Sequence, residues 1–463
     1  MHPARPDPER LRALIASLET GLLERAGAVR LVLLAALAGE HVLLIGPPGT
    51  AKSELARRLH RAFDGARYFE RLLTRFSTPE ELFGPLSLKA LEDDRYERLT
   101  TGYLPTASIA FLDEVFKANS AILNALLTLL NEREFDNGAG RTCTPLISVI
   151  GASNEVPVEE ALTAFYDRFL LRVPVAAVSD AVFIDLLALV DAPAALAGPA
   201  AQPLTQADLS AWLAAAESVQ PSDAVLDHLQ ALRAFLREAD VTVSDRRWRQ
   251  LIGLLRCAAY TEGRDQIDPL DLWLVPYVMA ALPAQVEGLQ RWFVDQVAQA
   301  APAQAPWLER AVEAFEQQLD LERRAEADDG GGAGKLALAR SIGGANDDAM
   351  PRLLTATLEA QLQRRYSSAH VAARVAQVSE ALADARAHAA ALQVHADALR
   401  DALAGRVWLP PDLAARLQAG PETTVARLHG WAERLQAARD GFAHLPLEPG
   451  AAGEAPAPIA LRA

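Results

Sequence analysis

The chain of 463 residues has few cysteines, no long hydrophobic run and few lysines. Its two cysteines, Cys143 and Cys257, lie far apart in the sequence, so they provide neither a disulfide framework nor a four-ligand zinc site, and a reducing compartment is expected. The longest apolar stretches, 29–38 and 270–282, are shorter than the roughly 20 residues that a membrane span requires. The N-terminus lacks the apolar segment of a signal peptide. We therefore expect a soluble, cytoplasmic protein without a transmembrane segment.

Positive charge is also scarce, because 45 Lys and Arg residues stand against 60 Asp and Glu, for a net charge of −15. Without a global positive field, no nucleic acid is expected as the main partner. Only four basic residues are lysines, so each lysine merits attention: they are Lys52, Lys89, Lys117 and Lys335. Hydrophobic residues make up 51% of the chain, as in ordinary folded proteins, and the length suggests about three domains.

Residues 1–185 alternate between short apolar runs and segments of helical periodicity. Strands are predicted at 41–45, 108–112 and 146–150, and helices at 8–38, 53–62 and 119–132. Hairpins are expected at 86–104 and at 134–150, the second turning at Asn137-Gly138 and using the strand at 146–150 as its second arm. This alternation predicts an α/β fold with a parallel sheet.

Beyond residue 185 the strand signals fade. We predict an all-helical domain over 186–285 and a C-terminal helical arm over 286–445, followed by a loose tail at 446–463. Within the arm, the glycine-rich stretch 330–350 is predicted to be a flexible loop.

The strongest motif joins a predicted strand to a predicted helix. Its residues are Gly46, Pro47, Pro48, Gly49, Thr50, Ala51, Lys52 and Ser53. In such a P-loop, backbone N–H groups surround the phosphates, the lysine reaches the β and γ oxygens, and the Ser53 hydroxyl holds Mg²⁺. Ala51 stands where glycine is usual, and its methyl group is compatible with the loop if it has ordinary helical dihedral angles. A coincidental Gly-Pro turn is the alternative, but the strand-to-helix context favours binding of ATP or ADP with Mg²⁺.

Two carboxylates, Asp113 and Glu114, follow the predicted strand 108–112. An aspartate in this position can order the water shell of Mg²⁺, and a glutamate can polarise the attacking water. Paired acids after a strand are common, so this interpretation depends on the P-loop. Asn154, after the third strand, is a candidate for positioning the hydrolytic water, with a simple turn asparagine as the alternative.

Two arginines are candidates for stabilising phosphate charge. Arg168 lies near the end of a predicted helix, and Arg172 and Arg133 are less favoured alternatives. Arg246 lies in the first turn of a helix capped by Ser244, where a cation opposes the helix dipole unless a phosphate is near. Since the chain has 41 arginines, a surface role is the alternative for each of them.

In their order along the chain these stretches resemble AAA+ ATPases of the MoxR group, and specifically its RavA (regulatory ATPase variant A) branch. The resemblance is carried by LLIGPPGTAKS, TRFSTPEELFGPLS, RYERLTTGYLP, FLDEVFKANSAILNALLTLLNERE, ASNEVP, YDRFLLR and VSDRRWR. It is dense over residues 10–180 and extends to about 260. By motif it implies Walker A at 46–53, Walker B at Asp113 and Glu114, sensor 1 at Asn154, an arginine finger at Arg168 and sensor 2 at Arg246. Leu23 is a further candidate for contacting the nucleotide.

The resemblance further implies a P-loop AAA+ core, a helical lid and a helical arm, assembled as a hexameric ring that hydrolyses ATP at subunit interfaces. Its implied client is a protein with a von Willebrand factor A (vWA) domain, which the ring remodels like a chaperone. Known RavA proteins carry a β-rich accessory module in the arm, and we expect 330–350 to replace it here. A nucleic-acid-stimulated motor is an alternative that the acidic balance disfavours. A nucleotide-gated scaffold without turnover is another, which has no need of Glu114 as a base.

Overall fold

The computed structural model describes residues 5–138, 140–157, 159–189, 202–298, 306–325, 364–448 and 453–459. By its internal contacts the chain divides into two compact units, one of residues 1–300 with 402–417 and the other of 301–401 with 418–463. The loop predicted at 330–350, and with it the predicted absence of an accessory module, lies outside the described residues.

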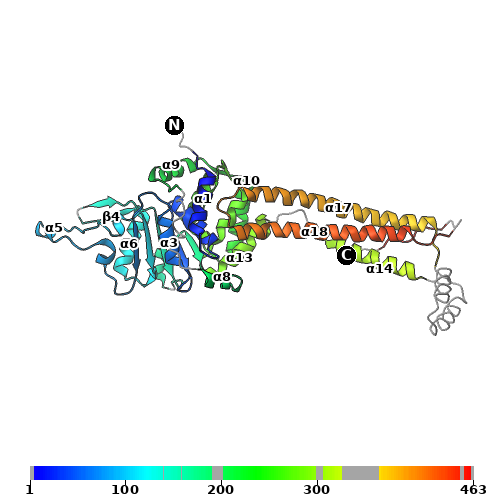
Figure 1. Ribbon diagram of the computed structural model, residues 1–463, viewed down its shortest axis with the longest axis horizontal. Coiled ribbons are helices and arrows are strands. Elements are labelled where there is room, and N and C mark those ends of the chain that lie inside the picture. The colour runs from blue at the N-terminus through cyan, green and yellow to red at the C-terminus, as the bar shows by residue number, and fades with distance from the viewer. Residues whose placement is uncertain are drawn as a thin grey trace. The chain divides into compact units, whose positions relative to one another are not determined.

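The first unit contains a five-stranded sheet in the order β2-β3-β6-β1-β7, visible as the layer of arrows in Figure 1, and every neighbouring pair is parallel. The strands are β1 (Val42–Ile45), β2 (Tyr68–Leu72), β3 (Ile109–Asp113), β6 (Ser148–Ser153) and β7 (Leu171–Pro174). The register aligns Ile45 with Ser153 and Leu112 with Gly151. The carboxyl ends of β1, β3 and β6 therefore meet at one edge, which is where ligands bind in parallel α/β sheets.

The sheet strands alternate with helices along the chain, and capping residues begin some of these helices. The helices are α1 (Pro8–Glu19), α2 (Ala26–Leu37), α3 (Lys52–His60), α4 (Pro79–Phe83), α5 (Leu88–Glu92), α6 (Ser120–Glu132), α7 (Glu160–Tyr166) and α8 (Phe183–Ala188). A capping box of Thr78 and Glu81 begins α4, and the Asn119 side chain accepts from Ile122 N to cap α6. Gly21, at φ 75°, lies in the turn that divides the predicted segment 8–38 into α1 and α2.

The part of the first unit after residue 200 is almost entirely helical. Its helices are α9 (Gln206–Ala216), α10 (Asp223–Glu238), α11 (Asp245–Thr261), α12 (Val275–Met279) and α13 (Pro283–Phe293), with a 3₁₀ helix at Pro269–Leu274. Two two-residue strands, β8 (Gln220–Pro221) and β9 (Gln266–Ile267), pair beside them. Thr205, Ser222 and Ser244 cap α9, α10 and α11 through their side-chain oxygens.

The two predicted hairpins differ from the structure in different ways. Between 134 and 150, β4 (Glu134–Asp136) pairs with β5 (Arg141–Cys143), so the second arm is β5, and β6 is a separate strand of the main sheet. Between 86 and 104 the hairpin prediction is wrong, because this stretch contains α5 and a single antiparallel bridge from Leu86 to Arg98. The Ser87 side chain accepts from Ala90 N and so begins the helix.

The second unit has its own core, which α14 (Pro306–Arg324), α17 (Ser368–Ala404) and α18 (Pro411–Ala443) contribute. Glu322 on α14 accepts hydrogen bonds from His370 and Arg374 on α17, both at 3.0 Å. The last residues of α17 and the first of α18 belong to the first unit. Among the described helices, none is long and apolar enough to cross a membrane.

Candidate active site

The phosphate-binding loop, residues 46–53, joins β1 to α3 at the carboxyl edge of the sheet. Gly46 N donates to Ser153 O at 3.0 Å, which ties the start of the loop to β6. A Cβ atom at Gly46 would lie 2.0 Å from Val175 O, so only glycine fits there. Gly49 has φ 79°, a left-handed conformation that glycine adopts without strain. The Thr50 hydroxyl donates to Pro47 O at 3.0 Å and closes the turn.

Ala51 does not have the helical dihedral angles that its methyl group was expected to require. Its φ of 65° and ψ of 22° are left-handed, so the expectation is wrong and the residue carries strain of about 1 kcal/mol or more. Ala51 is the N-cap of α3 and makes no side-chain cap hydrogen bond. The first N–H groups of α3 are therefore left for a ligand, and the positive end of the helix favours an anion.

Lys52 is buried, and its ammonium group lies over the loop. Its Nζ donates to Gly46 O and to Pro47 O, both at 2.8 Å. Desolvation lowers the pKa of Lys52, while the charges of Asp113 and Glu114 act to raise it. The side chain is thus held in place over the loop and interacts with both carboxylates.

A line of polar contacts connects the three strand ends. Asn154 Oδ1 lies 3.5 Å from Lys52 Nζ, and Asn154 Nδ2 donates to Glu114 Oε1 at 2.6 Å. Asp113 Oδ1 accepts from Glu114 N at 3.0 Å, and Glu114 itself is left-handed at φ 51°. Lys52, Glu114 and Asn154, which the sequence predicted separately, are therefore brought together.

Sequence reasoning missed two basic residues at this edge. Lys117 Nζ lies 3.3 Å from Glu114 Oε2, and its rarity as one of four lysines was a usable signal. Arg25 is 7% exposed and donates from Nε to Thr50 O at 3.3 Å. Nothing in the sequence distinguishes Arg25 from the other arginines. Leu23, half-buried, lies two residues before it in the turn between α1 and α2.

The residues at this edge fit a nucleotide with Mg²⁺. The Ser53 hydroxyl and the Asp113 carboxylate offer the oxygen ligands that Mg²⁺ prefers, and Mg²⁺ usually takes its other ligands from water and phosphate. Within the described ranges, no cluster of three or more His, Cys, Asp or Glu that could hold a metal is found.

The three candidate finger arginines differ in their surroundings. Arg133 donates to Gly39 O, Leu146 O and Ile147 O, and Arg172 stacks 3.9 Å from the Tyr166 ring and donates to Ala280 O. Both therefore serve the fold. Arg168 is half-buried, and its Nε has no hydrogen-bond partner in the described part of the chain.

Arg168 and Arg246 are not brought to Lys52 within one chain. Leu171 N donates to His41 O, so the segment that follows Arg168 lies at the amino end of β1, opposite the phosphate-binding loop. Arg246 Nη2 lies 3.5 Å from Asn131 Oδ1, and the next residue, Arg247, pairs with Asp167 at 3.2 Å. The two arginines thus lie on the same side of the unit, away from the other site residues.

Known families match both parts of the first unit. Residues 9–203 match the MoxR domain in the MoxR-vWA-beta-propeller ternary systems, and residues 224–293 match an AAA lid domain. An uncharacterized protein of Methanocaldococcus jannaschii is 42% identical over 264 residues, covering 56% of this chain and 69% of the relative. The chain belongs to the MoxR group of AAA+ ATPases. A second uncharacterized protein of that organism is 40% identical over 272 residues, covering 58% and 70%.

Protein MoxR of Paracoccus denitrificans is 29% identical to this MoxR-type chain over 295 residues, covering 57% of the chain and 85% of MoxR. The description of the matched MoxR domain names vWA and β-propeller systems and does not name the RavA branch.

Proposed function

We propose that this MoxR-type protein hydrolyses ATP and uses the energy to remodel a partner protein. The observation that carries the proposal is the line of contacts from Lys52 through Asn154 to Glu114, since it joins a phosphate-binding cation to a general base. Bound Mg²⁺-ATP supplies the γ-phosphoryl group and a metal charge that offsets its oxygens. Lys52 would bind the phosphates, and Ser53 and Asp113 would hold the metal and its water. Glu114 would take the proton of the water that attacks the γ-phosphorus as ADP leaves, and Asn154 would orient Glu114.

The functional unit is proposed to be a ring, with a hexamer as the expected size. Arg168 and Arg246 lie on the side of the unit away from its own phosphate-binding loop. In a ring that side can face the loop of the next subunit, where a cation stabilises charge on the transferred phosphoryl group. Unlike Arg133, which donates to three carbonyl groups of its own chain, Arg168 makes no side-chain hydrogen bond to the described residues, which supports a role for its guanidinium toward a neighbouring subunit.

The proposed client carries a vWA domain. The support is the description of the matched family, which joins a MoxR domain to vWA and β-propeller partners. The finer assignment to the RavA branch rests on the seven sequence phrases alone. A hydrolysis-deficient ring that retains a purified vWA-domain protein only with ATP present would support this client.

Two substitutions test the ATPase itself. Lys52→Ala removes the mobile counter-charge of the phosphates, so we expect ATP binding to be lost in isothermal titration calorimetry. Glu114→Gln keeps the shape but cannot accept the water proton, so we expect ATP to bind and turnover to fall by roughly 10²-fold or more.

The matched control is Lys89→Ala, since Lys89 is exposed on α5. It should leave both ATP binding and phosphate release unchanged. Near-normal ATP affinity of Lys52→Ala, or wild-type turnover by Glu114→Gln, would refute the assigned roles.

A further inference from the structure

Arg25 is a buried cation whose position in the fold has no role in the chemistry described above. It precedes α2 and is 7% exposed. Among the described residues its guanidinium donates to three backbone carbonyl oxygens: Thr50 O at 3.3 Å, Ala176 O at 2.6 Å and Glu24 O at 3.1 Å. Burying a guanidinium without a carboxylate partner costs free energy. The three hydrogen bonds of Arg25 offset that cost by connecting backbone segments that a smaller side chain could not reach. They join the turn before α2, the phosphate-binding loop and the segment after β7.

The contact with Thr50 O fixes one particular peptide group. In a trans peptide the C=O and the following N–H point in opposite directions. When Arg25 holds Thr50 O, the N–H of Ala51 is directed away from Arg25. This peptide leads into the strained, left-handed Ala51, and such conformations persist only when surrounding contacts hold them. Arg25 supplies such a contact at the residue where alanine replaces the usual glycine.

We propose that Arg25 is a positioning residue of the phosphate-binding loop, which holds the Thr50–Ala51 peptide in the orientation for nucleotide binding and compensates for alanine at position 51. This inference rests on the proposed nucleotide site. It implies that Arg25 and Ala51 are energetically coupled, because a glycine at position 51 adopts the left-handed conformation without support.

A double-mutant cycle tests the coupling. The measurement is the dissociation constant of ADP for the full-length wild type, Arg25→Ala, Ala51→Gly and the double variant. We expect Arg25→Ala to weaken ADP binding by at least tenfold in the wild-type background and by no more than threefold in the Ala51→Gly background. Rescue by glycine is a result that a purely structural role of Arg25 would not produce.

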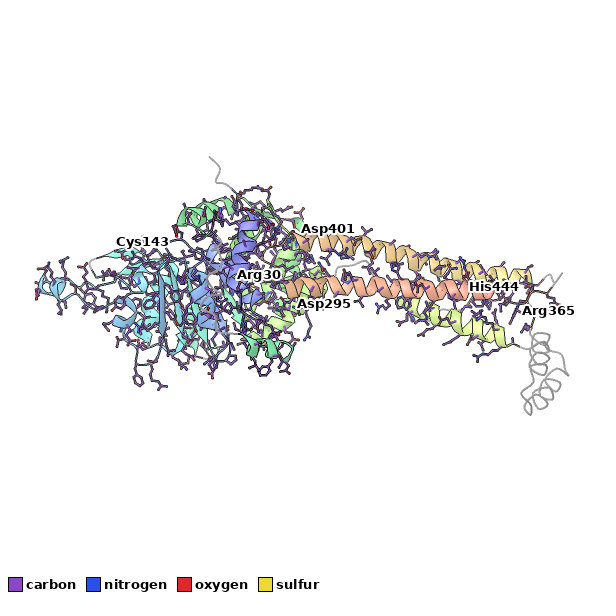
Figure 2. All side chains as sticks on the ribbon, viewed as in Figure 1. Arg30, Cys143, Asp295, Arg365, Asp401 and His444 are labelled. Atoms are coloured by element: carbon purple, nitrogen blue, oxygen red, sulfur yellow. The ribbon has the colours of Figure 1, made fainter. Side chains whose placement is uncertain are left out.

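Arg30 provides the matched control, since it is a partly buried arginine on α2, the helix that Arg25 precedes (Figure 2). It pairs with Glu19 and donates to Val407 O at 3.3 Å, away from the loop. Arg30→Ala should lower the melting temperature but change the ADP affinity by less than twofold. If Arg25→Ala does not fold, Arg25→Lys serves instead, because lysine keeps the charge but loses the forked geometry that reaches Thr50 O and Ala176 O together.

Equal losses of affinity in the two backgrounds would overturn the proposal, since Arg25 would then act independently of the peptide. An unchanged ADP affinity of Arg25→Ala would overturn it as well. A wild-type protein that binds no ADP would instead refute the proposed nucleotide site, so the two failures are distinguishable.

Discussion

At the scale of single residues, Glu40 makes the stability of the first unit depend on pH. Burial raises its pKa to about 7, although the charges of Arg133 and Arg246 and a hydrogen bond from Gln250 act to lower it. The native state therefore keeps this proton between about pH 4.5 and 7, where the unfolded chain has released it. Since the native state binds more protons there, its stability falls as the pH rises through this window.

Glu40→Gln removes that titration and keeps the contact with Gln250. Relative to wild type, we expect the variant to gain up to about 3 kcal/mol between pH 4.5 and 7.5. Denaturant midpoints at these two pH values measure the difference. Glu92→Gln on α5, which alters an exposed carboxylate, is the control and should show no such gain. A constant difference between Glu40→Gln and wild type at both pH values would contradict the assignment.

The candidate site residues differ in whether the sequence predicts their position. Lys52, Glu114 and Asn154 were predictable because each follows a buried strand, and parallel strands bring their carboxyl ends to one edge. The left-handed conformation of Ala51 was not predictable, because residue type alone favours the opposite assignment. The contact between Arg25 and Thr50 joins positions 25 residues apart through a side chain of the commonest cation in the chain, so no local pattern marks it.

At the scale of elements, the stretch 86–104 contains both a hairpin pattern and a helix-capping residue, and the structure forms the helix. The acidic turn at 92–94 predicted a hairpin, but Ser87 accepts from Ala90 N and begins α5 instead. Asn137 was predicted as part of a turn, and its side chain also accepts from Arg98 N at 2.8 Å. Contacts between distant segments of this kind decide between the alternatives that a short sequence window leaves open.

Arg168, which follows α7, gives a prediction about contacts between subunits. If Arg168 acts on the nucleotide of a neighbouring subunit, Arg168→Ala should bind ATP normally and lose roughly 10³-fold in turnover. Mixing it with wild type should lower the activity more than dilution does, because each variant subunit disables a wild-type neighbour. Phosphate release measured across mixing ratios gives this curve.

Arg310→Ala, an exposed arginine on α14, is the control for that mixing experiment. Phosphate release by mixtures of Arg310→Ala and wild type should stay at the wild-type level at every mixing ratio. If phosphate release instead falls linearly with the fraction of Arg168→Ala subunits, the substitution affects only its own subunit, and another residue must be the arginine finger. Arg133 is then a poor substitute, since its guanidinium already serves three carbonyl groups.

At the scale of the whole molecule, the sequence predicted the order of sheet, lid and helical arm but not that residues 402–417 belong to the first unit. The joining segment carries Trp408, which is 1% exposed and donates from Nε1 to Thr261 Oγ1 at 2.8 Å. The same segment lines a cavity of about 690 Å³ together with Arg25, through Pro410, Pro411, Asp412, Leu413 and Arg416. A turn between two long helices has no local signal for such burial, because its partners lie more than a hundred residues away.

The ion pairs of Arg406 give the last prediction. Its side chain is 8% exposed and lies 2.9 Å from Asp271 and 3.4 Å from Glu262, whose side chains are 4% and 3% exposed. Arg264 also pairs with Asp271 and Glu262, so removing Arg406 leaves these buried carboxylates with fewer cationic contacts, and Arg406→Ala should destabilise the first unit by roughly 1–3 kcal/mol. Arg400, 47% exposed and paired with Asp397 and Glu422, is the matched control, and Arg400→Ala should leave the stability nearly unchanged because exposed ion pairs contribute little.

The pH dependence of that loss distinguishes charge from packing. Burial raises the pKa of Asp271 to about 6, while Arg264 and Arg406 act to lower it. Without Arg406 the Asp271 carboxyl group keeps its proton to higher pH, and once it is protonated the native state buries one negative charge fewer beside Arg264. Denaturant unfolding should therefore give a smaller loss for Arg406→Ala at pH 5 than at pH 8. A loss of equal size at both pH values would mean that Arg406 contributes through its aliphatic contacts, and not through the buried carboxylates of the first unit.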